Sequence, residues 1–214
     1  MPEIVCTTVY QFLELSDAAK EKASCWYRDL GPHDDWWDAV YEDFERVCEI
    51  LGIRLKTTSV RLMGGGTRAK PCIWFSGFWS QGDGASFEGY WSHVKGAAAR
   101  IRDYAPTDVT LHGIADRLQA IQRRNFYQLA AEVSHRGRYY HEYTMSVDVT
   151  RDSPTWQSPT DDAEEIVTEA LRDLARWLYR QLEAEYDHLT SDEAIEEGII
   201  VNEYTFTEAG RRFG

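Results

Sequence analysis

The sequence predicts an α+β fold, built as a mostly antiparallel sheet of about five to six strands with helices packed at its faces and ends. Residues 35–51 and 161–187 repeat apolar side chains at the spacing of a helix face. Residues 55–62 instead alternate as a half-buried strand does. Hairpin signals between such strand-like runs favour antiparallel pairing.

The first third of the chain is predicted to form a strand followed by two helices. Residues 4–13 are rich in β-branched and aromatic side chains, which favour a strand. Ser16 is the expected N-cap of a helix that ends at Gly31, because glycine just past a helix usually stops it. The second helix covers residues 35–51 and ends before Gly52.

The middle of the chain is predicted to hold most of the strands. Asp83 and Gly84 lie between two strand-like runs and give a strong hairpin signal. Gly137 lies in the turn of a second predicted hairpin, and residues 64–66 form a flexible glycine turn. The strands predicted here span residues 55–62, 73–79, 85–91, 126–134 and 139–150.

Four more helices and an edge strand complete the prediction. Thr107 or Asp108 is expected to cap the second of these helices, and Ser191 the last one. The four helices cover residues 93–103, a segment that includes Leu111 to Ile121, residues 161–187, and a short segment after Ser191. The edge strand covers residues 204–206. Because no repeat or clear linker interrupts these elements, we expect a single domain over residues 1–214.

Cysteine usage and hydropathy indicate a protein of a reducing cytoplasm. The four cysteines are widely spaced and include no CxxC pair. We expect Cys25 and Cys48 to be buried thiols on helix faces. No apolar run approaches the roughly 20 residues that a membrane span needs, and residues 1–5 lack the basic region of a signal peptide.

The formal net charge of −13 is unevenly distributed along the chain. Residues 29–49 carry eight acids and one base, and residues 161–203 carry fourteen acids and three bases. Residues 50–160, by contrast, carry nine acids and fourteen bases. Such a chain is not expected to bind nucleic acid directly, because phosphate contacts need lysine and arginine. The acids are either solvated helix faces balanced by the basic sheet, or a negative surface for a positively charged partner.

The glycine-rich run over residues 75–90 is the most distinctive stretch, and it includes the carboxylates of Asp83 and Glu88. It lacks the spaced ligands of an EF-hand and the Gly-Lys-Ser/Thr end of a P-loop. We therefore expect a mainly structural hairpin, with a binding surface as the alternative. The sequence predicts no cofactor and no metal site. His135 and His141 would have to converge with both carboxylates to form one.

The residues predicted to bind a partner are carboxylates of the two acidic segments and side chains of the first hairpin. Exposed tryptophan is a favoured anchor at interfaces, and carboxylates complement a basic groove. The candidates are Asp34, Asp35, Asp38, Glu42, Asp43, Glu45, Trp79, Asp83, Glu88, Trp91, Glu165 and Glu169.

Three stretches carry a family resemblance. The first and most specific, residues 73–89, contains SGFWSQGDGASFEG, and the others are residues 138–143 and 178–194. Together they resemble a family of phage and prophage proteins, mostly uncharacterised and sometimes labelled antitoxin-like, over roughly residues 55–207. The resemblance implies a mobile-element context, in which small acidic proteins often inhibit host defences.

The sequence favours a binding protein over an enzyme, since it has no nucleophile elbow, dinucleotide-binding glycine pattern or HExxH. We expect a phage- or prophage-type acidic inhibitor, an anti-CRISPR or other anti-defence protein, acting in the host cytoplasm. It would act as a nucleic-acid mimic and bind to a basic groove of a host protein or ribonucleoprotein complex. The alternatives are an antitoxin that neutralises its toxin by direct contact and a metal-dependent enzyme.

Overall fold

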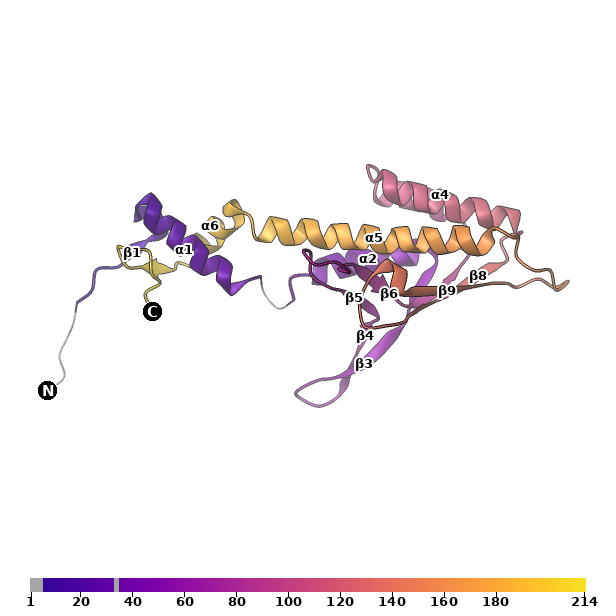
Figure 1. Cartoon of the computed structure of the whole chain (residues 1–214), viewed down its shortest axis with the longest axis horizontal. Coiled ribbons are helices and arrows are strands. Elements are labelled where there is room, and N and C mark those ends of the chain that lie inside the picture. Colours follow the sequence, from indigo (N-terminus) through magenta and orange to yellow (C-terminus); the bar gives the residue numbers. More distant parts are fainter. Residues whose placement is uncertain (1–5, 33–34) are drawn as a thin grey trace. The chain divides into compact units, whose positions relative to one another are not determined.

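The computed structural model describes residues 6–32 and 35–214 and confirms the α+β class (Figure 1). Helices, with the 3₁₀ turns included, make up 46% of the described residues and strands 20%, and the strand pairs among these residues are antiparallel. The helices are α1 (Asp17–Leu30), α2 (Asp38–Leu51), α3 (Ala97–Tyr104), α4 (Val109–Arg124), α5 (Ala163–Leu189) and α6 (Asp192–Val201). The strands are β1 (Tyr10–Gln11), β2 (Ile53–Leu55), β3 (Thr57–Arg61), β4 (Thr67–Pro71), β5 (Ile73–Phe75), β6 (Ala85–Phe87), β7 (Gly89–Ser92), β8 (Leu129–His135), β9 (Met145–Arg151) and β10 (Thr205–Phe206).

Two compact units make up the chain. The terminal unit consists of residues 1–37 and 183–214, and the central unit consists of residues 38–182. The single domain over residues 1–214 that the sequence predicts stays a prediction, because compactness alone does not show whether the units fold independently.

The largest sheet of the central unit has four antiparallel strands in the order β2-β7-β8-β9. Successive side chains of a strand point to opposite faces of the sheet. On one face Trp91, Ala131 and Val133 are buried, whereas Tyr90 and Glu132 on the other face are exposed. The sheet therefore has one face in the core and one open to solvent.

Helices α2, α4 and α5 close the core of the central unit. Leu51 of α2 and Leu118 of α4 line a small cavity together with Trp91 of the sheet. Phe44 of α2 stacks on Trp177 of α5, with ring centroids 6.5 Å apart. Helices α4 and α5 extend beside each other, joined by the ion pair of Arg117 with Asp173 (Figure 1).

The longest helix, α5, buries the face that its apolar spacing predicts. Val167, Leu171, Leu174 and Leu178 are fully buried. Because they recur every three or four residues, they form one stripe along the helix. Among the helices of residues 6–32 and 35–214, none combines the length and apolar composition that a membrane crossing requires.

The terminal unit has a small core of its own, supplied by α1, α6, the β1–β10 pair and the residues between β1 and α1. A Cβ atom on Gly198 of α6 would overlap the Tyr27 hydroxyl, so glycine at this position lets α6 approach α1 closely. The buried members of this core are Phe12, Leu15, Ala19, Ala23, Ile195, Ile199 and Phe206.

Two local predictions near helix starts are corrected. The strand expected over residues 4–13 is reduced to Tyr10–Gln11, and its first two residues lie outside the described part. Phe12–Glu14 form a 3₁₀ turn instead, whose phenylalanine packs into the terminal core. The helix expected over residues 93–103 begins only at Ala97.

The strands are also divided differently from the prediction. Residues 76–84 form an ordered loop, so β5 and β6 span only three residues each. The strand predicted over residues 85–91 is interrupted at Glu88, and β4 had no counterpart in the prediction. The result is one sheet of four strands and three two-stranded pairs, instead of one sheet of five or six strands.

Two of the predicted N-caps are confirmed by hydrogen bonds. The backbone N–H of Leu111 donates to Asp108 Oδ1 at 2.9 Å, and that of Ala194 donates to Ser191 Oγ at 3.2 Å. Ser16 holds the N-cap position of α1 without such a bond. Side-chain oxygens at these positions satisfy amide groups that the first helical turn leaves unpaired.

The cysteine prediction is half confirmed. Cys48 is buried, and burial raises the pKa of its thiol well above the usual range, with the nearby Glu45 carboxylate adding to the shift. Cys25 is exposed, because it lies on the opposite side of α1 from the buried Ala23. Cys72 is buried as well.

Alkylation by iodoacetamide should therefore divide the thiols into two classes. Cys6 and Cys25 are exposed and should react fast in the native protein. Cys48 and Cys72 should react more than about tenfold slower, because their thiols become accessible only when the structure opens. Peptide mass spectrometry of timed samples measures each rate. Equal rates at all four cysteines in the native protein, as expected in denaturant, would contradict this burial pattern.

Candidate functional site

The loop of residues 76–84, here called the signature loop, is where the three stretches of the family resemblance meet. The hydroxyl of Tyr179 on α5 donates a hydrogen bond to the carbonyl of Gly77 at 2.9 Å. The Ser76 hydroxyl donates to the Tyr140 carbonyl at 3.4 Å. The ring of Tyr140 also stacks on Trp74, with centroids 5.8 Å apart and planes inclined by 9°. Segments far apart in sequence are thus joined around one loop.

The carboxylate of Asp83 holds the signature loop in shape. Its Oδ2 accepts hydrogen bonds from the backbone N–H groups of Trp79 and Ser80, at 3.1 and 2.7 Å. The Ser76 hydroxyl accepts from the N–H of Gly84 at 3.2 Å. An aspartate that bonds to backbone groups a few residues away stabilises a turn. This explains Asp83 as a structural residue, although the sequence made it a candidate for partner binding.

Two glycines of the signature are required by close contacts. A Cβ atom on Gly84 would lie 2.9 Å from Cδ2 and 3.0 Å from Cα of His141. A Cβ atom on Gly89 would lie 2.7 Å from the carbonyl oxygen of Arg54 on the neighbouring strand. Close approach of another backbone is a common reason for glycine in or beside a strand.

Glu88 also bonds within the fold. It accepts a hydrogen bond from the backbone N–H of His135 at 2.9 Å. Lys56 Nζ lies 4.0 Å from Glu88 and 2.9 Å from Glu132. The hydrogen bond from Lys56 lowers the pKa of the Glu132 carboxyl. Glu88 therefore ties β8 to the chain between β6 and β7.

Tyr41 of α2 contacts the base of the signature loop. Its ring meets Phe75 edge-on, with centroids 6.4 Å apart. Burial raises the pKa of the Tyr41 hydroxyl above its usual range, and the charge of Asp38 adds to the shift. The hydroxyl therefore stays protonated at physiological pH, which makes it unsuited to act as a general base.

A buried carboxylate that the sequence did not single out lies next to this loop. Glu142 is 8% exposed, and its oxygens lie 3.0 Å from Nδ1 of His141 and 3.9 Å from a guanidinium nitrogen of Arg176. Arg176 also contacts Asp173 at 2.9 Å. Glu142 thereby links the residues before β9 to α5. No signal in the sequence indicated this role, because the partner, Arg176, is far away along the chain.

The four residues that could have formed a metal site do not converge. Asp83 and Glu88 accept hydrogen bonds from backbone groups, and His141 packs against Gly84. Among the described residues, no group of three or more histidine, cysteine, aspartate and glutamate side chains is arranged to hold a metal ion. The geometry thus supplies no ligand set for the metal-dependent alternative.

The two candidate tryptophans of the first hairpin have different environments. Trp79, in the signature loop, is 78% exposed. Trp91, in β7, is 2% exposed and packs in the core of the central unit. The prediction that Trp91 binds a partner is therefore corrected, because a side chain buried in the core cannot contact one. Trp79 stays a candidate anchor.

The acidic face of α2 is exposed but partly bonded within the central unit. Asp38, Glu42 and Glu45 are exposed, as is Asp35 before the helix, and Asp34 lies outside the described residues. Burial raises the pKa of Glu45 and so does the neighbouring Glu42, whereas Arg68 lowers it. Asp43 is the remaining residue of this helix that the sequence predicts to bind a partner, and its carboxylate accepts a hydrogen bond from the hydroxyl of Tyr104.

Two of the four acids in the first half of α5, Glu169 and Asp173, are paired with arginines. Glu169 lies 2.8 Å from Arg172 and 3.4 Å from Arg176. Asp162, just before the helix, lies 2.7 Å from Arg124 of α4. The interpretation that acids are balanced within the fold therefore holds for Asp162, Glu169 and Asp173, whereas Glu164 and Glu165 are exposed.

The basic charge in the middle of the chain is concentrated on one exposed hairpin. Residues 50–82 contain five bases and no acid. Three of these bases, Arg61, Arg68 and Lys70, lie on the exposed β3–β4 pair. Part of the basic character that the sequence assigned to the sheet thus belongs to this hairpin, which is separate from the four-stranded sheet.

The uncompensated negative charge belongs to the terminal unit. Its two segments contain sixteen acids and five bases, a formal net charge of −11, whereas the central unit contains twenty acids and eighteen bases, a net charge of −2. The described residues of the terminal unit form one ion pair, between Arg28 and Asp192 at 2.6 Å. Asp192, Glu193, Glu196 and Glu197 of α6 are all exposed.

Comparison with family models matches residues 36–192 to a family described as a domain of unknown function (DUF8835). The matched span contains the whole central unit. No curated protein and no solved structure matches the chain.

Substituting Gly84 by alanine should destabilise the central unit. The added methyl group would press on His141, and overpacking of this kind costs roughly 1–3 kcal/mol. The free energy of unfolding, from urea titration followed by tryptophan fluorescence, measures the loss. Gly64→Ala is the matched control, because a Cβ atom there meets nothing within 4 Å and the backbone φ is not positive. Equal stability of both variants would show that the contact with His141 does not require glycine.

Proposed function

For this chain, which belongs to the DUF8835 family, we propose an inhibitory binding protein that occupies a positively charged groove of a nucleic-acid-handling host complex. The separation of charge between the two units carries the proposal. A net charge of −11 on the terminal unit, against −2 on the larger central unit, directs one part of the molecule toward a basic partner.

The physical basis is electrostatic complementarity. Charges that are not paired within the protein attract an oppositely charged surface, accelerate association and raise its dependence on salt. The exposed carboxylates of α6 are spaced along a helix and can meet side chains that otherwise bind phosphates. The paired acids of α5 and the bonded Asp43 contribute less, because their charge is already satisfied.

The biological setting comes from the family resemblance. Phage and prophage proteins that act against host defences, including anti-CRISPR proteins, work inside the host cell on complexes that bind nucleic acid. A role in the host cytoplasm as a nucleic-acid mimic agrees with both the resemblance and the charge of the terminal unit.

A second candidate function is neutralisation of a cognate toxin. The observation that favours it is Trp79, which is 78% exposed on the signature loop. Exposed tryptophan is enriched among the residues that contribute most to interfaces. The antitoxin alternative therefore rests on Trp79 and no longer on Trp91.

Removing two charges from α6 should weaken partner binding. Glu196→Gln with Glu197→Gln should raise the Kd roughly fivefold, since exposed charges contribute up to about 1 kcal/mol together. A partner captured from bacterial lysate by the immobilised chain, and then purified, supplies the assay. Duplex DNA should displace the chain from this partner, and rising salt should weaken the complex.

The matched control removes two adjacent exposed charges from the central unit, by Glu164→Gln with Glu165→Gln. It should leave the Kd nearly unchanged. A stronger effect of this control would assign binding to the start of α5. Capture of a small toxin whose binding ignores salt and DNA but is lost in Trp79→Ala would replace the inhibitor proposal by the antitoxin alternative.

A further inference from the structure

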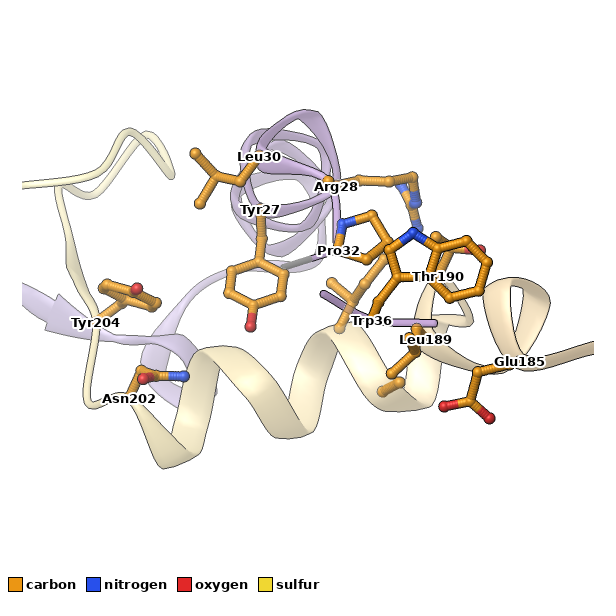
Figure 2. A pocket seen from close by; sticks show the side chains of 13 residues that line it. Tyr27, Arg28, Leu30, Pro32, Trp36, Glu185, Leu189, Thr190, Asn202 and Tyr204 are labelled. Carbon is orange, nitrogen blue, oxygen red and sulfur yellow. The ribbon is translucent and has the colours of Figure 1, made fainter. Parts of the chain in front are cut away.

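A pocket of about 510 Å³ lies within the terminal unit, and all of its lining residues belong to that unit (Figure 2). Figure 2 shows the rings of Tyr27, Trp36 and Tyr204 along it, with Glu185 at the opposite end from Tyr204. Its volume is within the range of sites that hold a small ligand or an inserted side chain. An aromatic pocket of this size can receive one large side chain.

Two helix C-termini form part of the wall. Tyr27, Arg28 and Leu30 come from the last turn of α1, and Glu185 and Leu189 come from the last turns of α5. The C-terminus of a helix carries partial negative charge, because its last carbonyl groups have no partner within the helix. Both of these helix ends favour a cation. The first turn of α6, which supplies Ala194 and Ile195, has the opposite partial charge, and Asp192 and Glu193 in that turn offset it.

The charged side chains around the pocket also favour a cation. Among the described residues, Arg28 is the one basic residue that lines it, and its guanidinium lies 2.6 Å from the carboxylate of Asp192. The positive charge of Arg28 is thereby neutralised, which leaves the carboxylate of Glu185. The unit as a whole carries a net charge of −11. A carboxylate or phosphate ligand would meet net repulsion here.

The aromatic side chains of this unit already bind a guanidinium group. Arg212, near the C-terminus, lies 5.1 Å from the ring centroids of both Trp26 and Tyr204. Guanidinium groups favour aromatic faces at such distances. Tyr204 belongs both to this contact and to the pocket lining. The pocket therefore offers a guanidinium group the same kind of aromatic surface that Arg212 contacts.

We infer that this pocket is an anchor site for an arginine side chain of the basic partner. The side chain would lie along the rings of Tyr27, Trp36 and Tyr204, with its guanidinium group toward the Glu185 end of the pocket. The inference rests on the proposed function and sharpens it. The proposed function needs only attraction between opposite charges, whereas this inference adds the recognition of one arginine by a defined pocket.

Titration of the full-length chain with a short acetylated and amidated peptide that contains one arginine among glycines and serines tests this inference. The matched peptide contains citrulline, which has nearly the same shape and no charge. The arginine peptide should bind and should shift the indole NMR signal of Trp36, identified by its loss in Trp36→Leu. Roughly fivefold weaker binding of the citrulline peptide is expected.

Two variants separate the pocket from the overall charge. Glu185→Gln and Glu196→Gln each remove one negative charge from the terminal unit, but only Glu185 lines the pocket. Glu185→Gln should weaken the arginine peptide several-fold more than Glu196→Gln does. Equal weakening by both variants, or equal binding of both peptides, would overturn the pocket and leave the charge-based function intact. The proposed function itself fails separately, if binding of the captured partner ignores salt and the α6 substitutions.

Discussion

The side chain of Trp177 joins three helices of the central unit, and the rest of that unit depends on this contact. Its ring is 4% exposed and stacks on Phe44 of α2. Its indole N–H donates to Asp108 Oδ2 at 2.6 Å, and the other oxygen of Asp108 caps α4. Loss of a large buried aromatic side chain lowers the free energy of unfolding by roughly 3–5 kcal/mol. Trp177 of α5 is therefore an important contact between α5, α2 and α4. The sheet and the signature loop are built beside this core.

The signature loop shows how a distinctive sequence can serve mainly the fold. Asp83 bonds to its own loop, Gly84 accommodates His141, and Glu88 connects to β8. These contacts give the glycines and carboxylates of residues 83–89 structural roles. The large apolar side chain that the loop exposes to solvent is Trp79, so an apolar anchor on this loop would depend on that side chain.

The two units differ in how far their acids are paired with bases, and this difference is not visible in the order of residues along the chain. In the central unit, helices α4 and α5 lie close enough for Arg117 and Arg124 to neutralise Asp173 and Asp162. The terminal unit has five bases for its sixteen acids, and the acids of α1 and α6 lie on helices around its small core. Negative charge that is not paired inside a fold acts on whatever approaches it, and the proposed binding to a basic partner rests on this property of the terminal unit.

The sequence by itself determined the features that depend on neighbouring residues. The α+β class, the buried stripe of α5 and the caps at Asp108 and Ser191 follow from periodicity and from contacts within one helical turn. Only the tertiary structure decided the features that depend on residues far apart. Trp91 is buried because β7 lies between β2 and β8 under the helices, although Trp79, from the same aromatic run, is exposed. Asp162 and Arg124 are 38 positions apart, so their pairing could not be read from local charge. Folding brings the two termini of the sequence into one unit, which therefore carries most of the net negative charge, and it pairs acids such as Asp162 and Asp173 of the central unit with distant bases.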